Sequence, residues 1–141
     1  MTAVLDASAV LAVYFDESGA DQVQAILPGA RLSSVNYTEV IGKLLDRGDA
    51  LNGALRKLAA MGFHIVAHDA PLARRAGELR PLTRQLGLSL ADRACLALAE
   101  RERLPVLTAD RKWSMLDIGI DIRLIRRPRR NGINFCRPRI M

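Results

Sequence analysis

The sequence TAVLDASAVLAVYF, residues 2–15, contains the transition that decides the fold. A short apolar run over residues 2–5 predicts a buried strand, which ends at Asp6. Residues 7–15 have helical character, so a helix follows the strand directly. In open α/β sheets ligands bind beyond the carboxyl ends of the strands, which makes Asp6 a candidate functional residue.

The rest of the chain repeats this alternation of short apolar strands and helices. Glycine and proline separate the segments, as at Pro28-Gly29 and Gly62. The pattern predicts an α/β domain with a mainly parallel sheet and helices on both faces. We expect strands over residues 31–33, 63–67, 105–108 and 120–125, and helices over residues 20–27, from Ser34 or Asn36 to 47, and over 50–61, 70–79 and 90–103.

The chain has 141 residues, which suits one domain with one sizeable core. We place that domain at residues 1–125 and a basic, flexible tail at residues 126–141. The tail has six arginines and no acid, so the remaining 15 basic residues balance the 15 acidic ones. The tail either adds phosphate contacts for RNA or is an inert extension, and both interpretations stay open.

The two cysteines, Cys95 and Cys136, are far apart in sequence and suggest neither a zinc site nor a redox pair. His64 and His68 lack enough neighbouring ligands for zinc. We find neither a signal peptide nor an apolar run long enough to span a bilayer, and we expect a soluble cytoplasmic protein without a membrane partner.

Four carboxylates occupy positions that such a fold brings to one end of the sheet. Asp6 follows the first strand and Asp110 follows the strand over residues 105–108. Glu39 lies about one turn into its helix, and Asp92 lies in the first turn of another. Helix starts in this type of fold lie at the same edge as strand ends.

Clustered carboxylates repel each other unless a cation neutralises them. Mg²⁺ or Mn²⁺ prefers such oxygen ligands and activates water for attack on a phosphodiester. Ser8, two residues after Asp6, and Thr108, two before Asp110, would orient carboxylates or waters. Lys43 either reaches the scissile phosphate or forms an ordinary salt bridge. Arg93 and Arg111 contact phosphate, pair with a carboxylate or are ordinary surface cations.

A structural role is the competing interpretation for each acid. Asp6 and Asp110 would cap the helical segments that follow them. Asn36 to Glu39 and Ser89 to Asp92 both have the spacing of a capping box. For one acid the two interpretations are balanced, and only the set of four at one sheet edge favours a metal site.

Four segments resemble the motifs of the PIN-domain ribonucleases, and they occur in the family's order and at its separations. The resemblance covers roughly residues 1–125, and the small size resembles toxins of the VapC type. The segments are VLDASA (residues 4–9), SVNYTEV (34–40), LSLADRACLALA (88–99) and VLTADRKW (106–113).

The resemblance implies more than the residue pattern does. It implies a parallel sheet with helices on both sides and hydrolysis of RNA with Mg²⁺ or Mn²⁺. It also implies an RNA substrate such as tRNA or ribosomal RNA, a homodimer, and inhibition by a VapB-type antitoxin. Carried over by position, the metal-binding and catalytic residues would be Asp6, Glu39, Asp92 and Asp110.

Three other functions compete with this one. A haloacid-dehalogenase-like phosphatase needs a second Asp two residues after the first, and Ser8 occupies that position. A receiver-type signalling domain needs an acidic pair that the chain lacks. A PIN-fold module that binds RNA or protein without catalysis stays open, and metal binding would separate it from an enzyme. The apolar helix over residues 10–15 is either buried or a surface for the antitoxin or a second subunit.

Overall fold

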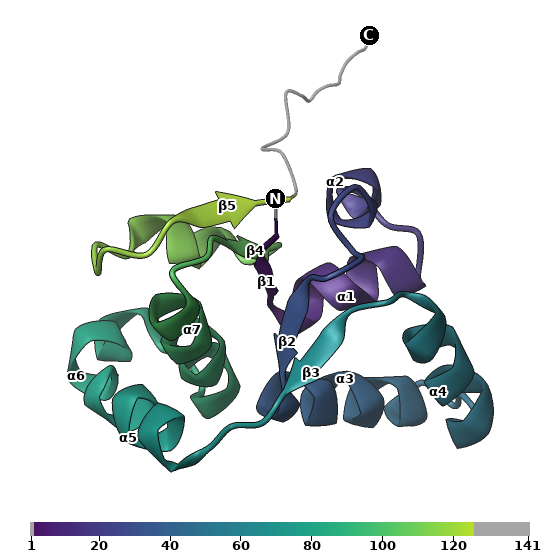
Figure 1. Ribbon diagram of the computed structural model, residues 1–141, viewed down its shortest axis with the longest axis horizontal. Helices are drawn as coiled ribbons and strands as arrows, with labels where there is room; N and C mark the ends of the chain where they lie inside the picture. Colours follow the sequence, from purple (N-terminus) through teal and green to yellow (C-terminus); the bar gives the residue numbers. More distant parts are fainter. Residues whose placement is uncertain (1, 126–141) are drawn as a thin grey trace, which may run out of the picture.

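A five-stranded parallel sheet lies at the centre of the protein (Figure 1), in a computed structural model that describes residues 2–125. The predicted tail, residues 126–141, lies outside the described residues, as does Cys136. The strand order is β3-β2-β1-β4-β5, and every neighbouring pair is parallel. The strands are β1 (Val4–Leu5), β2 (Arg31–Ser33), β3 (His64–Val66), β4 (Val106–Thr108) and β5 (Ile122–Leu124).

The helices connect the strands in the alternation that the sequence predicts. They are α1 (Ala7–Tyr14), α2 (Ala20–Gln24), α3 (Ser34–Asp46), α4 (Leu51–Ala60), α5 (Ala70–Glu78), α6 (Arg80–Thr83) and α7 (Leu90–Glu102). Two 3₁₀ segments, Arg84–Leu86 and Arg111–Met115, complete the described elements. The α/β class with helices on both faces is therefore confirmed, and the sheet is wholly parallel in the described residues.

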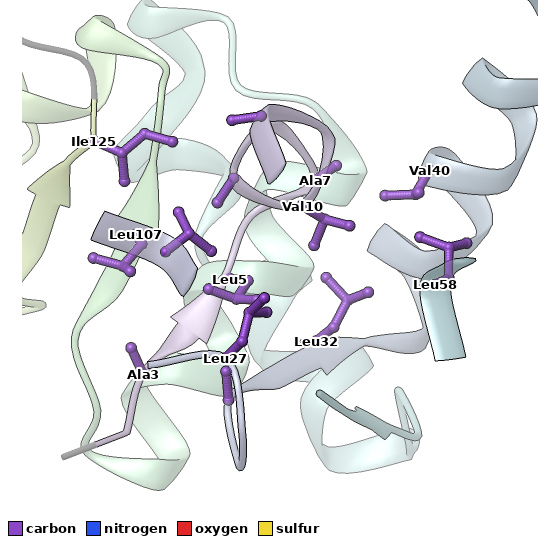
Figure 2. Close-up of a cluster of buried hydrophobic side chains, with 14 of the residues drawn as sticks. Ala3, Leu5, Ala7, Val10, Leu27, Leu32, Val40, Leu58, Leu107 and Ile125 are labelled. Atoms are coloured by element: carbon purple, nitrogen blue, oxygen red, sulfur yellow. The ribbon is translucent and has the colours of Figure 1, made fainter. Parts of the chain in front are cut away.

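Alternating side chains of the central strands pack into two cores, because successive residues of a strand point to opposite faces. Leu5 and Leu107 pack with α1 to α4, in the core shown in Figure 2. Val4 and Val106 pack on the opposite face with α5 and α7. β1 and β4 are buried on both faces for this reason, which is typical of the central strands of a parallel sheet.

The predicted boundaries differ from the structure mainly at two places. Helix α3 has Ser33 as its N-cap, with Ser33 Oγ accepting from the Val35 amide at 3.2 Å, so the predicted cap at Ser34 or Asn36 is wrong. Residues 80–86 also form α6 and a 3₁₀ segment, where the sequence analysis predicted none. Buried Leu79 and Thr83 hold this segment against the protein, and tertiary packing of this kind is not visible in local sequence.

Among residues 2–125, no helix combines the length and the apolar character that crossing a bilayer requires.

Candidate active site

The strand order reverses at β1, since the chain winds outward to β2 and β3 and then returns to place β4 on the other side. Ligands of doubly wound sheets bind in the crevice beyond the strands at such a switch point. Asp6 follows β1, and Asp110 lies two residues beyond the end of β4. Two of the four predicted acids therefore follow the two strands that form the switch point.

Asp6 is buried, with 5% of its surface exposed. Its Oδ2 accepts hydrogen bonds from Ser8 Oγ at 2.7 Å and from Thr108 Oγ1 at 3.0 Å. The two hydroxyls that the sequence analysis proposed as orienting groups thus both hold this carboxylate. Because both donate to Oδ2, neither of them engages Oδ1.

Backbone amides fix the direction of these two hydroxyl groups. The Ala109 amide donates to Ser8 Oγ at 2.9 Å, and the Asp110 amide donates to Thr108 Oγ1 at 3.0 Å. Each hydroxyl oxygen accepts from the backbone, so its proton is available for Asp6. The segment after β4 therefore determines how the carboxylate after β1 is held.

Burial raises the pKa of Asp6 from 3.8 to about 6. The hydrogen bonds from Ser8 and Thr108 lower it, and the charges of Asp92 and Glu39 raise it further. A buried carboxylate is harder to ionise because the charged form loses its hydration. Asp6 is thus a carboxylate whose negative charge is unfavourable in the absence of a cation.

Glu39 lies in the second turn of α3 and is half-buried. Its Oε1 is buried and has no hydrogen-bond partner within residues 2–125, while Oε2 lies 3.8 Å from Lys43 Nζ. Buried polar oxygens are normally hydrogen-bonded, and an orphaned one points to a group that the chain itself does not supply. A bound cation is one such group.

Asp92 and Asp110 combine the predicted site position with a capping role. Asp92 Oδ2 accepts from the Ser89 amide at 2.9 Å, and Ser89 Oγ accepts from the Asp92 amide, which completes a capping box. Asp110 Oδ1 accepts from the Lys112 amide at 3.0 Å. Asp6 makes no side-chain cap, although it is the N-cap residue of α1. The capping interpretation therefore does not apply to the side chain of Asp6. Asp92 and Asp110 act as caps and remain candidate site residues as well.

The second capping box considered for the sequence, Asn36 to Glu39, is not present. Asn36 is inside α3 and fully buried, and its Nδ2 donates to the Ala91 carbonyl at 3.1 Å. This contact joins α3, which holds Glu39, to the start of α7, which holds Asp92. The sequence analysis missed this role, and the one available signal was a polar residue on the apolar face of an amphipathic helix.

Cys95 lies behind the end of β1, near three of the candidate acids. The thiol is fully buried and its Sγ lies 3.7 Å from the Leu5 carbonyl, directly behind the end of β1. Burial raises the pKa of this thiol well above its usual value, and the charges of Asp6, Asp92 and Glu39 raise it further. Cys95 is a core residue.

These carboxylates are chemically suitable ligands for a divalent cation, but they are not yet arranged as a metal-binding site. Their oxygen donors, the orphaned Glu39 oxygen and the raised pKa of Asp6 are all features that a hard cation would relieve. In the part of the chain that the structure describes, no three Asp, Glu, His or Cys side chains are already close enough to bind a metal together. A cation would therefore have to draw the acids closer.

The remaining candidates either have structural roles or lie at the surface or sheet edge in the described residues. Arg93 Nη1 donates to the Ala76 carbonyl at 3.0 Å and joins α7 to α5. Trp113 is fully buried among the residues packed on α7. Arg111 is exposed, His64 lies on the edge strand β3, and His68 lies beyond its end.

A wholly parallel sheet whose strand order reverses at β1 defines a doubly wound α/β domain, in which two of the candidate acids follow the strands at the switch point. The chain belongs to the PIN domain family, whose model matches residues 3–119. A comparison with curated protein sequences gives no significant match.

Solved structures of toxin–antitoxin proteins have the same fold. DNA-bound VapBC from Salmonella typhimurium has a TM-score of 0.67 at 17% identity, and the match covers 89% of this chain and 99% of that chain. VapC20 from Mycobacterium tuberculosis, described as a sarcin-ricin loop cleaving toxin, has a TM-score of 0.65 at 19% identity, covering 81% and 93%. A toxin-antitoxin complex from Klebsiella pneumoniae has a TM-score of 0.64 at 22% identity, covering 80% and 91%.

Proposed function

We propose that this protein is an endoribonuclease that depends on Mg²⁺ or Mn²⁺ and is the toxin of a type II toxin–antitoxin pair. The observation that carries the proposal is Asp6, a buried carboxylate at the switch point whose pKa is raised to about 6 beside two further acids. Perturbed carboxylates in a crevice are typical of functional sites. Asp6, Glu39, Asp92 and Asp110 are the proposed catalytic and metal-binding residues.

When bound, the divalent cation would supply an activated water and offset negative charge on the phosphodiester. Asp6 and Glu39 are the strongest candidate ligands, because one carries an unfavourable charge and the other a buried oxygen without a partner. Asp92 and Asp110 each use one oxygen for a cap and keep the other for binding or for orienting water.

The chain's own hydroxyl groups prepare Asp6 for this role. Ser8 and Thr108 fix the carboxylate through Oδ2 and favour its charged form. Preorganised groups of this kind need little rearrangement during the reaction, which is the main advantage of a folded site over free solutes. Lys43 balances the charge of Glu39 and is positioned one turn further along α3.

A non-catalytic module that binds RNA or protein is the competing function. The distances between the carboxylates favour the non-catalytic module, since no three of them in residues 2–125 lie close enough together to bind a metal. A metal titration separates the two functions. Tight binding of Mg²⁺ or Mn²⁺ that requires Asp6 supports the enzyme, and the absence of binding supports the module.

The proposed partner is a VapB-type antitoxin, and the proposed substrate is tRNA or ribosomal RNA. Support comes from the fold shared with VapBC proteins, including the toxin described as cleaving the sarcin-ricin loop. Toxins of the VapC kind are generally nucleases. We further propose a cytoplasmic homodimer.

Cleavage of RNA by the purified protein, freed of any antitoxin, tests the nuclease. Total cellular RNA is incubated with Mg²⁺, with Mn²⁺ or with a chelator, and Asp6→Asn is assayed in parallel. We expect discrete products that require the cation and Asp6, because the substitution removes the charge with little change in volume. Equal cleavage by Asp6→Asn would overturn the mechanism, and a folded protein that cleaves under no condition would favour the binding module.

A further inference from the structure

A hollow of about 190 Å³ lies between α1 and α3, next to the candidate active site. Its lining consists of Ser8, Leu11, Phe15, Glu17, Lys43 and Arg47. Ser8 connects it to the acids, since this lining residue also donates from Oγ to Asp6 at 2.7 Å. A group bound in the hollow would therefore lie beside the carboxylate that carries the proposed chemistry.

One face of α3 leads from the acids into this hollow. Glu39, Lys43 and Arg47 are spaced by four residues, which places them on the same face of the helix. Eight residues of α-helix span about 12 Å, the length of a short piece of an extended substrate. Lys43 Nζ lies 3.8 Å from Glu39 Oε2, so the first cation is next to the candidate metal ligand.

The outer part of the hollow is a stacked pair of an aromatic ring and a cation. The Arg47 guanidinium lies over the Phe15 ring at 4.0 Å from its centroid. Arginine planes and aromatic rings are the surfaces on which proteins stack unpaired RNA bases. Arg47 and Lys43 are both exposed, so their charged groups are accessible to a ligand.

We propose that this hollow binds one unpaired nucleotide of the RNA substrate, next to the phosphate that is cleaved. In this arrangement Lys43 contacts a backbone phosphate, and the base stacks on the Phe15–Arg47 pair. The inference rests on the proposed nuclease function and deepens it, since it selects a single-stranded segment such as a loop as the cleaved region.

Size and charge favour a nucleotide over a protein partner. Pockets that take a whole small molecule have volumes of about 300–1,000 Å³, so this hollow suits one unit of a larger ligand. Two of the six lining residues are cations and one, Glu17, is an acid, which favours an anionic ligand. Ser8 at the inner end is polar, as the approach to a phosphate requires.

RNA binding without cleavage tests the proposal directly. The affinity of Asp6→Asn for a short labelled single-stranded RNA is measured in chelator by fluorescence anisotropy, over a range of salt concentrations. Lys43→Gln, Arg47→Gln and Phe15→Leu are each added to this background. Circular dichroism and unfolding temperature establish that every variant is folded.

The three substitutions have different expected signatures. Lys43→Gln reduces the slope of log affinity against log salt by about 0.7, the value for one phosphate contact on a single strand. Arg47→Gln and Phe15→Leu weaken binding by about tenfold because they remove the stacking surface. Phe15→Leu leaves the salt slope unchanged, since leucine replaces the ring without altering charge.

Lys57→Gln is the matched control. Lys57 Nζ lies 4.9 Å from the centroid of the neighbouring ring, Tyr14, but Lys57 does not line the hollow. We expect the affinity and salt slope of this variant to equal those of the Asp6→Asn parent. A general effect of positive charge would instead weaken Lys57→Gln and Lys43→Gln alike.

The inference is overturned if the hollow variants bind RNA like their parent, if Lys57→Gln is weakened equally, or if the folded parent binds no RNA. If substitutions in the hollow leave RNA affinity unchanged, a protein partner such as the antitoxin becomes the favoured occupant. The proposed nuclease is tested separately, by cleavage assays on protein that retains Asp6. If that protein cleaves RNA while the hollow variants bind RNA with parental affinity, the nuclease function stands and only this binding site is refuted.

Discussion

Thr108 donates a hydrogen bond from Oγ1 to Oδ2 of Asp6 at 3.0 Å, joining the end of β4 to the end of β1 across 102 residues of sequence. The same Oγ1 accepts from the Asp110 amide at 3.0 Å. One hydroxyl group thus holds the central carboxylate and also fixes the backbone of a second candidate acid.

Thr108→Val removes this hydroxyl at nearly constant volume. We expect the pKa of Asp6 to rise above about 6, because the hydrogen bond from Thr108 lowers it. Cleavage should fall about tenfold near pH 6.5, since a hydrogen bond to a charged group contributes about 1.5–3 kcal/mol. The rate is measured between pH 5.5 and 8.5. Thr108→Ser keeps the donor and should retain the parental profile, and a Thr108→Val profile identical to the parent would refute the role.

Without a divalent cation, the stability of the protein should fall as pH rises through about 6. The pKa of Asp6 is 3.8 when unfolded and about 6 when folded, so the folded state binds the proton more tightly. At about 1.4 kcal/mol per pH unit, this group alone lowers the free energy of unfolding by about 2.4 kcal/mol between pH 4 and pH 7.

Asp6→Asn should abolish that part of the pH dependence. We expect the variant to be more stable than the parent at pH 7 in chelator, and the two to converge near pH 4. Urea unfolding at several pH values measures the difference. Asp46→Asn, at an exposed position of α3, is the matched control and should follow the parent. Parallel curves for the parent and Asp6→Asn would contradict the raised pKa.

A divalent cation should stabilise the folded protein, because it binds only where the acids are gathered. At a concentration one hundred times its dissociation constant, the gain is about 2.7 kcal/mol. Glu39→Gln should lose most of this gain, since it removes the charge beside the orphaned Oε1. Glu78→Gln, at an exposed position of α5, should keep the stabilisation by the cation. An equal response of both variants to Mn²⁺ in thermal unfolding would exclude Glu39 as a ligand.

Asn36→Leu should separate positioning from stability. The change removes the hydrogen bond to Ala91 but also removes an amide oxygen that is buried without a partner in the described residues. These effects oppose each other, so we expect a stability change within about 1 kcal/mol. Cation affinity should nevertheless fall, because the start of α7, which holds Asp92, loses its hydrogen bond to α3. Thr38→Val, an exposed change on the same helix, should alter neither quantity.

Gly19→Ala should destabilise the protein far more than Gly48→Ala. Both glycines have a positive φ, 93° and 94°, so alanine is strained by about 1 kcal/mol at either position. At Gly19 an added Cβ would also lie 2.3 Å from the Ile125 carbonyl oxygen, whereas at Gly48 it meets nothing within 4 Å. We expect about 1–3 kcal/mol of additional loss at Gly19 from this overlap. Equal unfolding temperatures for the two variants would contradict the close approach.

The alternation of elements was predictable because the central strands β1 and β4 are apolar on both faces and glycine or proline follows most of the helices. β2 and the start of α1 agree with the sequence prediction at the residue level. The segment over residues 80–86 was not predictable, because α6 is a four-residue helix containing Pro81 and depends on packing rather than on local preference.

The sequence by itself determined the α/β class, the order of strands and helices, and the positions of four acids relative to strand and helix ends. These are consequences of hydrophobic periodicity and of local stop and cap signals, which neighbouring residues encode. Only the tertiary structure decided the burial and the hydrogen-bond partners of each acid. Asp92 and Asp110 cap the segments beside them, and Glu39 has a buried oxygen without a partner in the described residues. Asp6 is buried and accepts hydrogen bonds from Ser8 in α1 and Thr108 in β4. Burial and hydrogen bonding across 102 residues depend on how strands pair, and that pairing is a property of the folded chain.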